Sequence, residues 1–221
     1  MCQLLLSPVR FYDNRRNRRV DWVVALAAPL GCALLQGTAA LIVSGKTRPV
    51  LEAALAGQLQ RTGLPSEYLM ATVAGLGYPM FFGVLTLAML ALNVFVRTPG
   101  SAARLTEFTA LGFYTQLPHA LLAIGIAWIW EPDVIQLSSG ASTADLLVAV
   151  SRYRDTVLSD PLPSTVRLLS LYSRIWLGAV LTIALKVVAR LSTGATAMAA
   201  LTLLTICAGG PLVGMLLEII R

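Results

Sequence analysis

Long apolar runs without charge are the dominant pattern of the chain. Four runs hold no charged residue, and a fifth is interrupted only by Arg174 and Lys186. A helix of about 20 apolar residues crosses the hydrocarbon core of a bilayer, so each run is long enough to span it. The runs therefore predict five transmembrane helices. Their expected bounds are about 22–43, 70–96, 107–130, 168–189 and 195–219.

The same runs indicate helices rather than strands. They are rich in Ala, Leu and Gly, and apolar and polar residues do not alternate with a period of two. An open sheet edge is not tolerated in lipid because its backbone groups stay unpaired. The composition, 57% apolar and 13% charged, also excludes an ordinary soluble domain or a disordered chain. We expect an all-α polytopic membrane protein, with a basic tail over 1–21 and one five-helix membrane domain over 22–221.

Two connections between the runs carry helical patterns of their own. Each has apolar residues at helical spacing opposite polar ones, which is typical of an amphipathic helix. The apolar stripes are Leu51, Leu55 and Leu59 within 44–65, and Leu146, Val150, Tyr153 and Val157 within 131–167. We expect two amphipathic helices in the outer loops. They either lie flat in the membrane interface or cap the bundle, and recognition of a partner protein is the alternative.

Positive charge is concentrated directly before the first span, and it predicts the orientation. The net charge is +6, and five of the 17 Lys and Arg residues form this cluster. They are Arg10, Arg15, Arg16, Arg18 and Arg19. A basic cluster beside a first span indicates a cytoplasmic N-terminus and contact with anionic headgroups, rather than nucleic-acid binding. Five spans then place the C-terminus outside, and we expect an inner (plasma) membrane protein.

Catalytic and metal-binding patterns do not emerge from the residues. The chain has one histidine, and Cys2, Cys32 and Cys207 lack the spacing of metal ligands. It also lacks paired-carboxylate, nucleophile-elbow, metalloprotease and phosphate-loop motifs. We expect no metal, no cofactor and no enzymatic activity.

Polar residues inside the spans are the candidate functional residues, because they are costly in lipid. We single out a candidate intramembrane polar site of Gln36, Gln116, His119 and Arg174. His119 lies near the middle of the third span, with Gln116 on the same face. It either bonds to a neighbouring helix or carries protons, although no carboxylate lies at its depth. Arg174 either snorkels outward, pairs with a polar group such as Gln36, or binds an anion.

Three stretches of the chain resemble the Yip family (Ypt-interacting proteins). They are Ser7-Pro8-Val9-Arg10-Phe11-Tyr12 before the first span, Phe113-Tyr114-Thr115-Gln116-Leu117-Pro118 in the third, and Leu169 to Trp176 followed by Lys186 to Ser192. The resemblance implies five spanning helices and a cytoplasmic N-terminus. In eukaryotes it also implies contact with Rab GTPases. The chain lacks the long N-terminal region and the Asp-Leu-Tyr-Gly-Pro motif of those members, so it is most similar to bacterial members and that role does not transfer.

The sequence leaves two functions open. The first is a non-catalytic membrane protein that organises lipids or partner proteins, with membrane proteins or further copies of the chain as partners. The alternative is a small permease or channel with a polar site between helices. A cavity that joins His119 and Arg174 favours transport, whereas a tight apolar bundle favours a scaffold.

Overall fold

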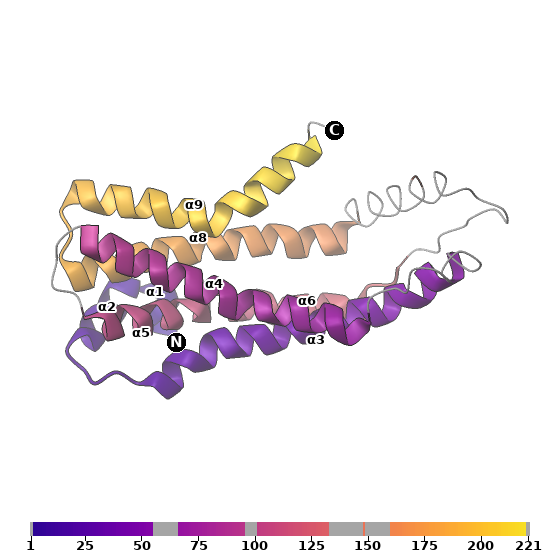
Figure 1. The fold of residues 1–221 in the computed structure, drawn as a ribbon, viewed down its shortest axis with the longest axis horizontal. Helices are drawn as coiled ribbons and strands as arrows, with labels where there is room; N and C mark the ends of the chain where they lie inside the picture. The colour runs from indigo at the N-terminus through magenta and orange to yellow at the C-terminus, as the bar shows by residue number, and fades with distance from the viewer. Residues whose placement is uncertain (1, 55–65, 96–100, 133–147, 149–159, 220–221) are drawn as a thin grey trace.

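A computed structural model describes residues 2–54, 66–95, 101–132, 148 and 160–219, and every ordered element in these ranges is helical. Two short helices, α1 (Cys2–Leu6) and α2 (Pro8–Arg16), precede the long ones. The long elements are α3 (Trp22–Ala54), α4 (Glu67–Phe95), α5 (Ala102–Gly112) with η1 (Phe113–Thr115) and α6 (Leu117–Ile129), α8 (Pro161–Ala189) and α9 (Thr193–Ile219). They include five segments long and apolar enough to cross a membrane, which confirms the predicted fold class. The long elements run along one common axis, except for the C-terminal part of α9, which bends away from it (Figure 1).

The first and fourth spans are longer than expected. α3 continues through Ala54, so Leu51, the first residue of the expected amphipathic stripe, lies on the same helix as the first span, which ends near Val50. Lys46 and Arg48 find polar partners there, which lets the helix continue past them. α8 begins at Pro161, because the Asp160 side chain accepts a hydrogen bond from the Leu162 N–H (2.8 Å) and caps it. The predicted helices over 55–65 and 133–159 lie outside the described residues, apart from Val148, which is helical.

The third span is broken in its middle. α5 ends at Gly112, a single 3₁₀ turn follows, and α6 restarts at Leu117. Pro118 has no N–H to continue the α-helical pattern, so the chain tightens before the new helix begins. Gln116 lies at this junction, and its backbone N–H donates to the Phe113 carbonyl at 2.9 Å. The break turns the polar side chain of Gln116 toward the other helices.

α3 and α4 pack with their backbones in direct contact at two glycines. A Cβ atom placed on Gly37 would lie 3.2 Å from the Ala71 carbonyl oxygen, and one on Gly75 would lie 3.1 Å from that of Ala33. Small residues allow such close approach between membrane helices, where van der Waals packing replaces the hydrophobic effect. The two helices therefore form one closely packed wall of the bundle.

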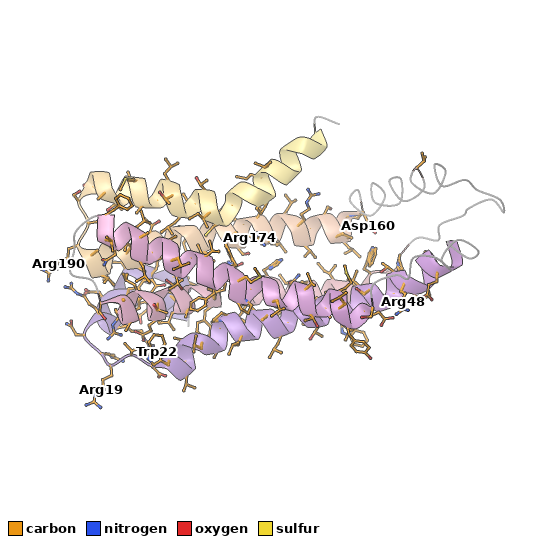
Figure 2. All side chains as sticks on the ribbon, viewed as in Figure 1. Arg19, Trp22, Arg48, Asp160, Arg174 and Arg190 are labelled. Carbon is orange, nitrogen blue, oxygen red and sulfur yellow. The ribbon has the colours of Figure 1, made fainter. Side chains whose placement is uncertain are left out.

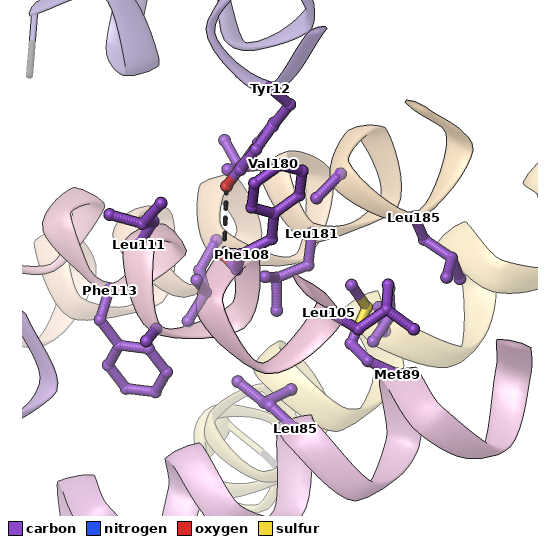
Figure 3. Close-up of a cluster of buried hydrophobic side chains, with 14 of the residues drawn as sticks. Tyr12, Leu85, Met89, Leu105, Phe108, Leu111, Phe113, Val180, Leu181 and Leu185 are labelled. Carbon is purple, nitrogen blue, oxygen red and sulfur yellow. Dashed lines mark hydrogen bonds between the residues drawn. The ribbon is translucent and has the colours of Figure 1, made fainter. Parts of the chain in front are cut away.

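The main apolar core surrounds α5 near the end that also holds the N-terminal helices. Figure 3 shows Tyr12 of α2 reaching Phe108 of α5, beside buried side chains from α4 and α8. The labelled core residues are Tyr12, Leu85, Met89, Leu105, Phe108, Leu111, Phe113, Val180, Leu181 and Leu185. The N-terminal segment, expected as a basic tail, thus contributes Leu4, Phe11 and Tyr12 to the core. Large apolar side chains such as Leu34, Val73 and Leu87 face outward, as a lipid-facing surface requires.

Candidate intramembrane polar site

A cavity of about 200 Å³ lies among α3, α4, the break in the third span, and α8. All four residues of the predicted polar site line it. The full lining is Gln36, Ala74, Gly77, Tyr78, Phe81, Gln116, His119, Ser170 and Arg174. Figure 2 shows Arg174 within α8, far from the charged residues Arg19 and Arg190 at one end and Arg48 and Asp160 at the other. The structure therefore brings together residues from three different spans, well inside the bundle.

Gln116 is fully engaged with α8. Its Nε2 donates to the Ser173 carbonyl at 2.7 Å, and its Oε1 accepts from the Ser173 hydroxyl at 3.0 Å. Both residues are buried. This reciprocal pair satisfies the amide and ties the broken third span to α8. Gln116 is thus a structural member of the site, with little capacity left for a ligand.

Arg174 lies in the cavity without a charged partner. In the described part of the chain it makes no ion pair and no hydrogen bond, and the pairing with Gln36 that we considered does not form. Its guanidinium stands over the Phe81 ring, 5.5 Å from the ring centroid. A cation over an aromatic face is stabilised by the ring quadrupole, but its N–H groups still need acceptors.

His119 is buried (6% exposed), and neither ring nitrogen is hydrogen-bonded within the described segments. The Val166 backbone of α8 acts on the ring without making a hydrogen bond of standard geometry. The bond to a neighbouring helix, one of the two alternatives, does not form with standard geometry among the described residues. The buried Oε1 of Gln36 has no partner either. Buried polar atoms are almost always paired, so these atoms mark a place where a further group fits.

Two apolar cavities adjoin the polar one. A cavity of about 310 Å³ shares Gln36 with it and is otherwise lined by Ala, Val, Ile, Trp and Pro side chains of α3, α6 and α8. Another, of about 430 Å³, shares His119 and is lined mainly by Leu5, Pro118, Leu122, Leu169 and Trp176, with Tyr172 and two hydroxyl residues. The polar cavity is thus flanked by space that suits hydrocarbon.

Sequence reasoning missed Tyr78, which also lines the polar cavity. Its hydroxyl makes no hydrogen bond to any residue that the structure describes. A signal was present in the sequence, because Tyr78 carries a polar hydroxyl inside the charge-free second span. No three His, Cys, Asp or Glu side chains gather as metal ligands within 2–54, 66–95, 101–132, 148 and 160–219.

A second polar cluster joins the basic tail to the third span. Glu107 of α5 is fully buried, and its carboxylate accepts from Arg15 (3.4 Å), from the Asp21 backbone N–H (3.3 Å) and from Arg104. Arg104 also donates to the Arg18 carbonyl. Arg15, predicted to contact headgroups, is therefore held by the protein. Arg10, Arg18 and Arg19 are exposed and Arg16 is partly exposed.

The Tyr12 side chain closes the same end of the bundle. Its hydroxyl donates to the Phe108 carbonyl at 3.4 Å, and its ring contacts the Phe108 ring with centroids 4.6 Å apart. Burial raises the pKa of Tyr12 well above the usual range of a phenol, because the charged form would lose its hydration. The basic segment is thus anchored by both an aromatic contact and an ion pair.

Comparison with known proteins identifies the class of this helical membrane protein. The Yip1 domain matches residues 2–214, so the chain belongs to the Yip1 family of multi-pass membrane proteins. Members of this family are generally non-catalytic proteins of membrane traffic. No curated protein matches the chain significantly, and no solved structure does so.

Proposed function

We propose that this chain is a non-catalytic Yip1-family protein that binds and organises lipids of its membrane. The observation that carries the proposal is the polar cavity flanked by two apolar ones through Gln36 and His119. A lipid has the same division into a polar head and apolar chains. Ions or small polar solutes, in contrast, need polar groups along the whole path. The apolar lining on both sides therefore favours an amphiphile.

The test is lipid retention by the purified protein. The full chain is extracted in mild detergent, and bound lipids are identified by native mass spectrometry. We expect phospholipid to stay bound at a defined stoichiometry after delipidating washes. A chain that retains no lipid, and that recovers no partner protein from membranes, contradicts the proposal.

A small permease or channel is the second candidate, and the cavity that joins His119 and Arg174 is the observation that favours it. Reconstituted liposomes distinguish the two functions. Solute flux above that of empty liposomes, reduced by His119→Ala or Arg174→Ala, supports transport through this cavity. Flux that both variants leave unchanged removes these residues from any transport path.

We also propose an inner (plasma) membrane location with the N-terminus in the cytoplasm and the C-terminus outside. The exposed arginines Arg10, Arg18 and Arg19 support this, because basic segments are retained on the cytoplasmic side near anionic headgroups. Partners on that side are then anionic lipids, with membrane proteins or further copies of the chain as additional partners. A fluorescent reporter fused after Arg221 tests the orientation. Bright fluorescence from the cytoplasm contradicts it.

A further inference from the structure

The polar cavity presents more hydrogen-bond donors than acceptors. Arg174 has five N–H donors, and neutral imidazole and phenol add one donor each from His119 and Tyr78. None of these three side chains makes a hydrogen bond in the described part of the chain. Gln36 contributes an amide, whose buried Oε1 has no partner in the described part of the chain. The missing component is a group rich in acceptors.

The cavity also carries a positive charge without compensation. None of the described residues that line it is Asp or Glu, and Arg174 is paired only with the Phe81 ring. Charges inside the membrane are costly unless an opposite charge or a polar environment accompanies them. A basic site with unpaired donors and no acid has the chemistry of an anion site.

We propose that this cavity binds a phosphate group, with Arg174 as the charged ligand and His119 and Tyr78 as additional donors. The planar guanidinium matches the oxygens of phosphate in pairs. A volume of about 200 Å³ exceeds the ~30 Å³ share of a water molecule several-fold, so a phosphate group fits. The inference rests on the proposed function, because it names the head of the lipid. The same chemistry suits the phosphodiester of a phospholipid and free phosphate.

Three probes separate the two sources. The full chain in mild detergent is titrated with phosphatidylglycerol, with dioleoylglycerol, which has the acyl chains but no phosphate, and with inorganic phosphate. Lipid binding is followed by native mass spectrometry and phosphate binding by calorimetry. Each titration is repeated with Arg174→Gln and with Lys186→Gln. Lys186 is exposed on the same helix and does not line the cavity, so its variant is the charge-matched control.

We expect phosphatidylglycerol to bind more tightly than dioleoylglycerol. We expect Arg174→Gln to weaken it roughly ten- to a hundred-fold, as loss of a charge-assisted pair of bonds does, and Lys186→Gln to leave it unchanged. Tyr78→Phe keeps the ring and removes one donor, so it tests the site even where Arg174→Gln does not fold. We expect it to weaken binding about three- to ten-fold. Circular dichroism and size-exclusion chromatography establish that each variant is folded.

The outcomes separate this inference from the proposed function. Inorganic phosphate that binds in an Arg174-dependent way, without phosphatidylglycerol binding, supports the anion site and contradicts the lipid function. Equal binding of the two lipids, unaffected by Arg174→Gln and Tyr78→Phe, overturns the anion site and leaves the lipid function standing. Absence of binding by all three probes overturns both.

Discussion

Glu107 is a fully buried carboxylate at the end of the bundle where the N-terminal helices pack. Two arginines from different parts of the chain, Arg15 and Arg104, compensate its charge, and the Asp21 backbone adds a third donor. Asp21 also caps α3 through its side chain, which accepts from the Val24 N–H at 3.1 Å. The cluster therefore fixes the N-terminal segment, the start of α3 and the broken third span to one another.

Substitution of Glu107 tests this cluster. We expect Glu107→Gln to reduce the free energy of unfolding by about 3 kcal/mol, because it leaves two arginines around a site without compensating charge. Denaturant titration in mild detergent measures the loss. Glu52→Gln is the control, since the Arg48–Glu52 pair is exposed and should contribute little. An equal, small effect of both variants contradicts a stabilising role of the buried cluster.

The Tyr12 phenol makes stability depend on pH at high pH. Its pKa is raised in the folded chain, so above about pH 10 the unfolded chain releases this proton while the folded chain retains it. We expect the wild type to lose stability more steeply than Tyr12→Phe as pH rises above about 10, measured by thermal unfolding. Below that pH, Tyr12→Phe should cost at most about 1 kcal/mol, because the hydrogen bond it removes is long. Parallel pH profiles of the two proteins contradict this.

At the scale of single residues, the four polar residues selected from the sequence line one cavity, but their partners were not predictable. Rarity in apolar spans was sufficient to select Gln36, Gln116, His119 and Arg174, because polar groups in lipid face the bundle interior. The partnership of Gln116 with Ser173 depends on the 3₁₀ turn before α6, whose effect on side-chain direction a linear pattern does not contain. Glu107 stands at the start of the expected third span, and nothing in the sequence shows that the N-terminal segment folds back over it.

At the scale of elements, the close contact of α3 and α4 depends on glycines. The Cα atoms of Gly37 in α3 and Gly75 in α4 lie close to the opposite helix. A Cβ atom at either position would meet backbone atoms of that helix rather than a flexible side chain. We expect Gly75→Ala to cost about 1–2 kcal/mol, because the helices must separate to admit the methyl group. This cost exceeds the stability that alanine gains over glycine from its better helix propensity.

Gly83→Ala is the matched control on the same helix. A Cβ at Gly83 meets nothing within 4 Å, so we expect this variant to be neutral or up to about 1 kcal/mol more stable. Thermal unfolding in one detergent compares the two variants directly. A loss at Gly83 as large as that at Gly75 would show that alanine is unfavourable in α4 for reasons other than the α3 contact.

The helices keep close to the expected bounds where a span ends in charge, and they extend past those bounds where charged residues find partners. The ends of α4 follow the polar flanks of its apolar run. α3 passes its expected end near 43, because the Lys46 Nζ donates to the carbonyls of Trp128 (2.6 Å) and Trp130 (2.7 Å) at the end of α6. These long-range bonds depend on α3 lying beside α6, which hydropathy along one segment does not reveal.

At the scale of the whole molecule, the bundle is closed at each end by a different polar network. The Glu107 cluster joins the N-terminal helices, α3 and α5 at one end. At the other, Lys46 joins α3 to the end of α6, and the Trp130 Nε1 donates to Asp160 (3.0 Å), the residue that caps α8. The polar cavity lies between them. Five spans and the family were predictable from the sequence. The two polar networks were not, because their hydrogen bonds join residues far apart in the chain. The separation is more than 80 positions for the bonds of Glu107 to the N-terminal segment and of Lys46 to α6, and 30 positions for Trp130 and Asp160.

The two networks should contribute independently to stability. About 25 residues of α3 separate Asp21 from Lys46, roughly 35 Å of helix at 1.5 Å per residue, and the networks share no partner. We expect Lys46→Met alone to cost about 1–2 kcal/mol, since it leaves two helix-end carbonyls without their charged donor. Combined with Glu107→Gln, its cost should add to within about 0.5 kcal/mol, as for distant sites. Unfolding free energies of the wild type, both single variants and the double variant form the cycle that measures this. A coupling above about 1 kcal/mol would mean that α3 transmits strain between the ends, and the cavity at its middle would then respond to changes at either.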